Sequence, residues 1–191
     1  MGVSPAPVRT TLCGVRLFVA VWPDVSVSRR LASLELGRVP GVRPVAPGQL
    51  HVTLRFLGEV DGDLLPDLAG ALEDAAGSIS GPIHCEAGPA TAWFSGGRVL
   101  QIPVAGLEDA ADAVQDATRS LVPTPDHRGR FTGHLTLGRA RGGRLPAAAR
   151  GALAGIPFSA SFDVESFDLV ASDLSAGGPR YVSLMRVPLA A

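Results

Sequence analysis

The chain has 191 residues, of which 46% are hydrophobic and 18% are charged, and its formal net charge is −1. This length and apolar content suit one globular domain and exclude a disordered chain, while the small net charge excludes the strongly basic surface of proteins that grip long duplexes. The sequence contains no lysine, and this excludes a Walker A loop and any lysine-bound nucleotide intermediate.

The first predicted element is a strand over Val15–Trp22, which is rich in β-branched and aromatic residues. This stretch is interrupted by Arg16 and is too short to cross a membrane, so neither a membrane span nor a signal peptide is expected. A helix is predicted over Asp24–Leu36, because a Pro-Asp pair opens it and apolar residues recur at helical spacing. Residues 1–13 are expected to be flexible, within a single domain that covers 1–191.

The next predicted strand, Leu50–Gly58, follows a connector rich in proline and glycine at Val39–Gly48. Asp61-Gly62-Asp63 then caps a predicted helix that ends at Gly77. One face of this helix carries an apolar stripe at a spacing of about four residues, made of Leu64, Leu68, Leu72 and Ala75.

A hairpin is predicted from two short strands, His84–Ala87 and Arg98–Ile102, which glycine-rich turns separate. The segment Gly106–Leu121 is predicted to be a helix, because apolar residues recur at helical period and acidic residues crowd its N-terminal end. A second long strand is predicted within Phe131–Arg139.

The last part of the chain is predicted to contain one short helix and three strands, namely Pro146–Leu153, Phe158–Val164, Ser166–Ser172 and Arg180–Val187. Strands and helices are mixed along the chain without strict alternation. This order favours an α+β fold with antiparallel sheets over a doubly wound parallel sheet.

The same four-residue word, His-aliphatic-Thr-Leu, occurs twice, beginning at His51 and at His134. One copy would carry little information, because a single histidine on a strand is more often structural than catalytic. Two copies in two predicted strands indicate a pseudo-symmetric structure with one motif in each half. Since residues two apart in a strand point to the same side, each histidine should lie beside its own threonine, Thr53 or Thr136.

Two neighbouring imidazoles can supply a general base and a general acid together, because an ordinary histidine titrates near pH 6.5. Opening a cyclic phosphate needs a water deprotonated on one side and a ribose oxygen protonated on the other. Hydroxyls and an arginine can stabilise the charge on the remaining phosphate oxygens, so the chemistry requires no metal ion or other cofactor.

The chain resembles the 2H phosphoesterase superfamily, and within it the bacterial RNA 2′,3′-cyclic phosphodiesterases, which are also described as 2′-5′ RNA ligases. The resemblance covers nearly the whole chain, and its motifs lie in Arg16–Ala20, Leu50–Val60, Phe131–Arg139, Ser172–Tyr181 and Val187–Leu189. It implies a two-lobed fold in which antiparallel sheets enclose a central groove and the helices lie outside. It also implies hydrolysis of 2′,3′-cyclic phosphate ends of RNA to a 2′-phosphate.

The resemblance assigns the proton donor to His51 and the proton acceptor to His134. It gives phosphate binding to Thr53, Thr136 and Arg139. Arg139 has odd parity relative to His134, so it reaches the site only if the strand ends or bulges near position 138. The family commonly has proline directly before the second histidine, whereas this chain has Gly133, and a looser entry into the strand is expected there.

Other residues have an ordinary structural interpretation beside a functional one. Arg55 shares the predicted face of His51, so it is either a phosphate ligand or an exposed strand arginine. His84 and His127 lack a companion threonine and are expected to be structural. A few aromatic residues are candidates to stack on a base, although most should belong to the core; they are Phe56, Trp93, Phe94, Phe131 and Tyr181.

The expected partner is RNA, or a nucleotide, with a 2′,3′-cyclic phosphate end, and the protein is expected to be a cytoplasmic monomer. Its two cysteines, Cys13 and Cys85, are too few for a disulfide framework, and no spacing of histidines and cysteines supports a zinc site. Two other functions stay open. One is ATP-independent 2′-5′ joining or cleavage of RNA by the same histidines, and the other is a non-catalytic module that binds RNA ends.

Overall fold

The structure is a computed structural model that describes residues 14–34, 36, 39–94, 96–123, 131–142, 145–175 and 178–190. The predicted flexibility of residues 1–13 and the structural interpretation of His127 concern residues outside these ranges.

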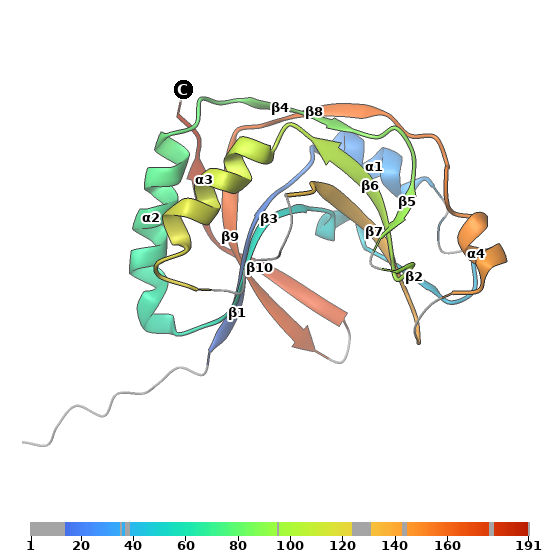
Figure 1. Cartoon of the computed structure of the whole chain (residues 1–191), viewed down its shortest axis with the longest axis horizontal. Helices are drawn as coiled ribbons and strands as arrows, with labels where there is room; N and C mark the ends of the chain where they lie inside the picture. The colour runs from blue at the N-terminus through green and yellow to red at the C-terminus, as the bar shows by residue number, and fades with distance from the viewer. Residues whose placement is uncertain are drawn as a thin grey trace, which may run out of the picture.

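The described residues form ten strands in two antiparallel sheets (Figure 1). The first sheet has the order β10-β9-β1-β3, with β1 at Val15–Val21, β3 at Val52–Val60, β9 at Ser166–Ser175 and β10 at Gly178–Pro188. The second sheet has the order β2-β7-β6-β4-β8, with β2 at Val42–Pro44, β4 at Ile83–Ala87, β6 at Val99–Ala105, β7 at His134–Ala140 and β8 at Ala160–Val164. The short strand β5, Ala92–Phe94, pairs with β6.

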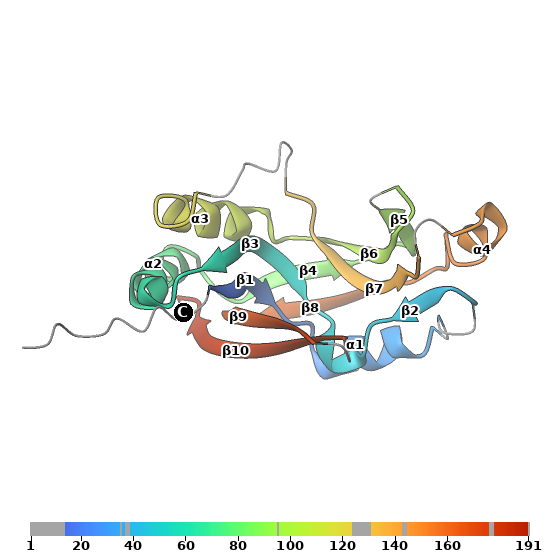
Figure 2. The ribbon, with the colours of Figure 1, turned by 90° about the horizontal axis from the view of Figure 1, so that it is seen from below.

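Four helices connect these strands: α1 at Val25–Ala32, α2 at Leu65–Gly77, α3 at Glu108–Thr118 and α4 at Ala147–Gly151. Two short 3₁₀ segments, η2 at Pro47–Gln49 and η3 at Gly62–Leu64, precede and follow β3. Figures 1 and 2 show α2 and α3 packed together at one end of the molecule and α4 at the other. In the described part of the chain, no helix is long and apolar enough to span a membrane.

Helix α1 begins where the sequence predicts, because the side chain of Asp24 accepts a hydrogen bond of 2.8 Å from the backbone N–H of Val27. It ends at Ala32, before the predicted limit of Leu36. Ser33 closes it, since its hydroxyl donates to the carbonyl of Arg30 and its backbone N–H to that of Arg29.

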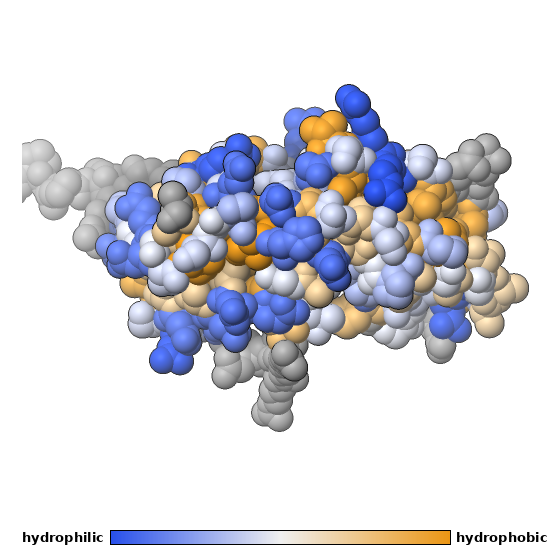
Figure 3. Space-filling model, turned by 90° about the horizontal axis from the view of Figure 1, so that it is seen from above, coloured by the Kyte–Doolittle hydropathy of each residue, from blue (hydrophilic) through white to orange (hydrophobic). Residues whose placement is uncertain are grey.

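One large core cluster includes buried residues from both sheets and from α1, α2 and α3. In α2 the buried residues are Leu68, Leu72, Ala75 and Ala76, so most of the predicted stripe is confirmed, while Leu64 belongs to the preceding 3₁₀ segment. The predicted α+β class with antiparallel sheets is confirmed. On the face in Figure 3, hydrophilic residues are interspersed with hydrophobic ones.

Candidate active site

The two motif histidines lie at the starts of strands from different sheets. His51 immediately precedes β3 of the first sheet, and His134 is the first residue of β7 of the second. The strands β3 and β7 are in contact, so the fold brings together two motifs that are far apart in the sequence. The predicted arrangement of one motif in each half is therefore present.

Both imidazoles are held in the same way by the backbone. Nδ1 of His51 lies 2.7 Å from the carbonyl oxygen of Gln49, and Nδ1 of His134 lies 3.0 Å from that of Thr132. A carbonyl can only accept, so in each case the hydrogen bond places a proton on Nδ1 and makes Nε2 the atom that gains or loses a proton. The two rings are oriented and have the same tautomer by this local geometry.

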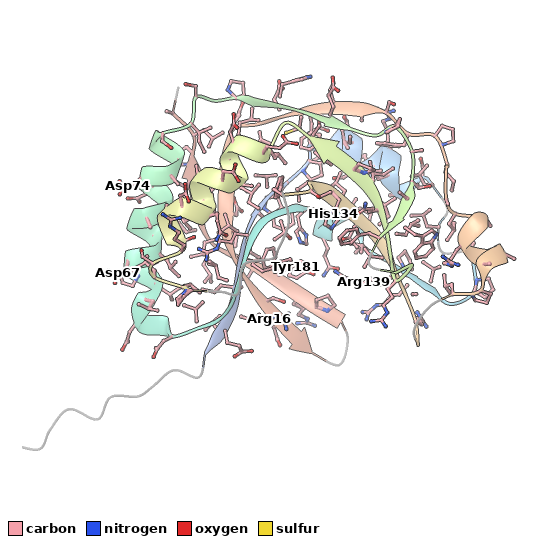
Figure 4. All side chains as sticks on the ribbon, viewed as in Figure 1. Arg16, Asp67, Asp74, His134, Arg139 and Tyr181 are labelled. Carbon is pink, nitrogen blue, oxygen red and sulfur yellow. The ribbon has the colours of Figure 1, made fainter. Side chains whose placement is uncertain are left out.

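A cleft of about 330 Å³ lies beside His51. Its lining comes from β2, η2, β7 and β10 and from the residues next to them: Arg43, Pro44, Val45, Ala46, Gln49, His51, Thr136, Arg139, Pro179 and Tyr181. Three of the five predicted site residues, His51, Thr136 and Arg139, are therefore part of the lining. His134 and Thr53 are not, although the charge of His134 acts on His51. Figure 4 shows His134, Arg139 and Tyr181 in the same central part of the molecule, away from the acidic residues labelled on α2.

The environment of His51 lowers its pKa below the ordinary value of 6.5. The largest cause is burial, which disfavours the charged imidazolium, and the positive charges of Arg139 and His134 act in the same direction. The hydrogen bond to the carbonyl of Gln49 opposes this effect. In the free protein, His51 therefore favours its neutral form.

Three aromatic rings surround His51, and the sequence did not single out two of them. The imidazole centroid lies 5.1 Å from that of Phe18, 5.4 Å from Trp22 and 5.0 Å from Tyr181. Phe18 and Trp22 are four residues apart in the first predicted strand. This even spacing places both rings on one face of the strand, and it was the signal in the sequence that could have found them. Tyr181 was named only as a candidate for base stacking.

A β-bulge brings Arg139 to the cleft. Along the pairing of β6 with β7, Leu100 lies opposite Gly138 and Gln101 opposite Thr136, so Leu137 is an extra residue without a partner. Leu137 and Gly138 are both buried, after which Arg139 is exposed again on the side of Thr136. The strand therefore bulges near position 138, as the sequence requires if Arg139 is to reach the site.

An equivalent bulge in β3 has the opposite effect on Arg55. Val19 pairs with Arg55 and Ala20 with Thr53, which leaves Leu54 as the extra residue. Arg55 consequently points into the core, where it is only 5% exposed, and donates hydrogen bonds to the hydroxyl of Thr118 and to the carbonyl of Val122, the latter at 2.7 Å. Both interpretations of Arg55 from the sequence, as a phosphate ligand or an exposed arginine, are wrong.

The expected loose entry at Gly133 is also wrong. The backbone N–H of Val104 donates to the carbonyl of Gly133 at 2.8 Å, and a Cβ added at Gly133 would lie 2.4 Å from the carbonyl oxygen of Val104. Glycine is needed here because the two backbones approach closely. The segment that carries His134 is therefore held tightly against β6.

The other named candidates lie in different surroundings. His84 is exposed and contacts Asp163 at 2.9 Å across β4 and β8, in agreement with a structural role. Phe94 is 46% exposed, and its ring centroid lies 5.5 Å from that of His134. Phe56 is 51% exposed. No group of three or more His, Cys, Asp or Glu side chains in the described ranges is arranged to hold a metal ion.

A larger cavity of about 810 Å³ lies elsewhere and is lined in part by Arg30, Glu86, Glu108 and Thr132. It contains neither motif histidine and neither motif threonine. The smaller cleft is the candidate active site, because three of the five predicted residues line it, and His134 lies close enough for its charge to act on His51.

Comparisons with known proteins find relatives that match most of the chain. A family model described as the 2′-5′ RNA ligase superfamily matches residues 23–176. An RNA 2′,3′-cyclic phosphodiesterase from Thermus thermophilus is 30% identical over 92% of this chain and 90% of its own length. A protein of the same name from Archaeoglobus fulgidus is 30% identical over 89% of this chain and 98% of its own length.

Solved structures are similar over the same extent. A crystal structure of a protein from Thermus thermophilus superposes with a TM-score of 0.80 at 29% identity, covering 91% of this chain and 97% of that one. The crystal structure of E. coli LigT complexed with 3′-AMP gives a TM-score of 0.68 at 28% identity, covering 92% and 98%.

Proposed function

Because the chain belongs to the 2′-5′ RNA ligase superfamily, we propose that it hydrolyses the 2′,3′-cyclic phosphodiester at RNA ends to a 2′-phosphomonoester, by histidine acid–base catalysis without a metal ion. Two relatives that are 30% identical over most of the chain are named RNA 2′,3′-cyclic phosphodiesterases, which supports the substrate class. The observation that carries the proposal is that His51 and His134 stand at the starts of β3 and β7, two strands in contact from different sheets, and each has Nδ1 held by a backbone carbonyl.

The reaction divides the proton transfers between the two rings. Nε2 of His134 takes a proton from a water molecule as the water oxygen bonds to phosphorus. The bond between phosphorus and the 3′ oxygen breaks, and Nε2 of His51 gives its proton to that oxygen. Thr53, Thr136 and Arg139 stabilise the negative charge on the phosphate oxygens that do not react. The 2′ oxygen keeps the phosphate.

To act as the proton donor, His51 must become protonated when the substrate binds. In the free protein, burial and the charge of Arg139 lower the pKa of His51. A bound cyclic phosphate places a negative charge near His51 and Arg139. This charge favours the imidazolium form of His51 and offsets the effect of the positive charge of Arg139. The substrate anion therefore prepares its own acid, and the essential acid should titrate at lower pH in kcat/KM, which reports the free enzyme, than in kcat.

The test is incubation with 2′,3′-cyclic nucleotides and with an oligonucleotide that has a cyclic end, in EDTA, followed by identification of the phosphate isomer. A 2′-phosphate should form. His51→Ala and His134→Ala should each lower kcat by roughly 10²- to 10⁴-fold, with circular dichroism spectra like the wild type. His84→Ala is a matched control, because it removes an exposed imidazole on β4. Turnover near the wild-type rate in either motif variant, or a 3′-phosphate product, rules out the mechanism.

A second candidate, ATP-independent 2′-5′ joining, is favoured by the description of the matching family. It is the same displacement of the 3′ oxygen at phosphorus, with a 5′-hydroxyl in place of water as the nucleophile. Incubating a 5′-hydroxyl end with a cyclic-phosphate end distinguishes the two, since a ligase forms a 2′-5′ bond at a rate comparable to hydrolysis. A module that only binds RNA ends would retain a 2′-phosphate oligonucleotide and show no turnover in EDTA.

A further inference from the structure

A second arginine, Arg43, lies directly beside Arg139 at the cleft. The two residues are opposite partners in the antiparallel pairing of β2 with β7, and both line the cleft. Directly opposite residues have Cβ atoms roughly 5 Å apart on the same face of a sheet, and like charges in this relation repel each other. The pairing therefore places two arginine side chains at one point of the rim, where both can contact an anion.

The charge of the lining has one sign. Among the described residues that line the cleft, two are arginines and none is aspartate or glutamate. The positive charge of Arg139 also acts on His51, since it contributes to the lowered pKa of that histidine. This chemistry is suited to more than one negative charge, whereas a cyclic mononucleotide carries a single anionic phosphate.

The position of Arg43 indicates where a second negative charge of the substrate would bind. β2 is the edge strand beside β7, so Arg43 lies one strand farther out than Arg139, and it is exposed. Nε2 of Gln49 donates a hydrogen bond of 2.6 Å to the carbonyl of Pro179, which joins η2 to β10 at the cleft. An RNA strand that continues from the cleft across β2 would pass Arg43.

The volume of the cleft limits how much of an RNA strand it can hold. About 330 Å³ is near the lower end of the range for small-molecule sites, which begins at about 300 Å³. There is room for one terminal nucleotide. The phosphate that links this nucleotide to the preceding one must lie outside, at the exposed edge.

We propose that Arg43 binds the phosphodiester on the 5′ side of the terminal nucleotide, so that the site recognises oligonucleotide ends and discriminates against cyclic mononucleotides. This inference rests on the proposed function and names its substrate more closely: a strand whose cyclic phosphate is reacted near Arg139 while its preceding phosphate pairs with Arg43.

The test compares two dinucleotides with a 2′,3′-cyclic end, one with an ordinary internal phosphodiester and one with an uncharged methylphosphonate in its place. The wild type should prefer the charged substrate. Arg43→Gln should lower kcat/KM for the charged dinucleotide about tenfold more than for the neutral one, mainly through KM, because a hydrogen bond to a charged group is worth about 1.5 kcal/mol or more. The slope of log kcat/KM against log salt for the charged dinucleotide should fall by about 0.7.

Two further variants separate recognition from other effects. Arg43→Lys keeps the charge and should retain the salt slope. Arg119→Gln removes the same charge at the end of α3 and should leave the preference of the wild type intact. Equal losses on both dinucleotides in Arg43→Gln, or no loss on either, overturn the inference while the proposed function stands. A wild type that turns over neither substrate overturns the proposed function itself and this inference with it.

Discussion

Replacing Gly133 by alanine tests how tightly the second motif is held. The added Cβ would lie 2.4 Å from the carbonyl oxygen of Val104, whereas carbon and oxygen atoms in such contacts are usually about 3.3–3.6 Å apart. The two backbones must therefore separate by about 1 Å, which also strains the hydrogen bond from Val104 to Gly133. Overpacking of this kind costs about 1–3 kcal/mol of the free energy of unfolding.

The same displacement should affect catalysis, because Gly133 lies between His134 and Thr132, whose carbonyl orients the imidazole. A misplacement of about 1 Å can lower the rate about 10²-fold. Urea denaturation and kcat/KM on a 2′,3′-cyclic nucleotide measure the two effects in one variant.

Gly48→Ala is the matched control for Gly133→Ala. Gly48 precedes the first motif, has no heavy atom within 4 Å of an added Cβ, and has a φ outside the left-handed region. Its replacement should leave activity unchanged and raise the free energy of unfolding by about 0.4–1 kcal/mol, because alanine restricts the unfolded chain. If Gly133→Ala unfolds and reacts like the wild type, the close approach of the strands does not position His134.

Three other outcomes are expected. Arg55→Met leaves the buried carbonyl of Val122 without the hydrogen bond from this side chain, so urea denaturation should show a loss of about 1–3 kcal/mol with kcat nearly unchanged; a larger effect on kcat than on stability would contradict this. Arg139→Gln should raise the pKa of His51 in an NMR titration, because the arginine's charge lowers it, and a lower pKa would be contrary evidence. The pKa of His51 is lower in the folded state than its ordinary value of 6.5, so the unfolded chain binds more protons near this pH. The free energy of unfolding should therefore fall as the pH drops below 6.5, and it should fall less steeply in His51→Gln. Equal slopes for the wild type and this variant would refute the argument.

Much of the fold follows from patterns within single segments. The strands and helices with strong periodicity lie close to their predicted positions, as for α3, predicted over Gly106–Leu121 and observed over Glu108–Thr118. The short strands β2 and β5 were not predicted, because each is three residues long and depends on pairing with a neighbour. Such pairing is a property of the assembled sheet.

Some of the site residues could be predicted from single segments, whereas others depend on how the strands pair. The repeated word singled out both histidines as candidates, and of the two threonines that alternation places beside them, Thr136 lines the cleft and Thr53 does not. Alternation failed for Arg55, because the bulge at Leu54 reverses the side on which the next residues lie, up to a second bulge at Leu57. The bulge at Leu137 brings Arg139 to the cleft and is followed by Gly138, a residue type that often marks a bulge, whereas Leu54 is followed by Arg55 and has no such signal. Both are set by how β3 and β7 pair with other strands.

The central claim is that His51 and His134 act together on one phosphate. The most direct measurement is the residual kcat of His51→Ala, His134→Ala and the double variant on a 2′,3′-cyclic nucleotide in EDTA. If the two rings serve the same bond-breaking event, the double variant should be about as slow as the slower single variant, because removing either group already disables the pair. Losses that multiply in the double variant would show that the two imidazoles act independently and would contradict this claim.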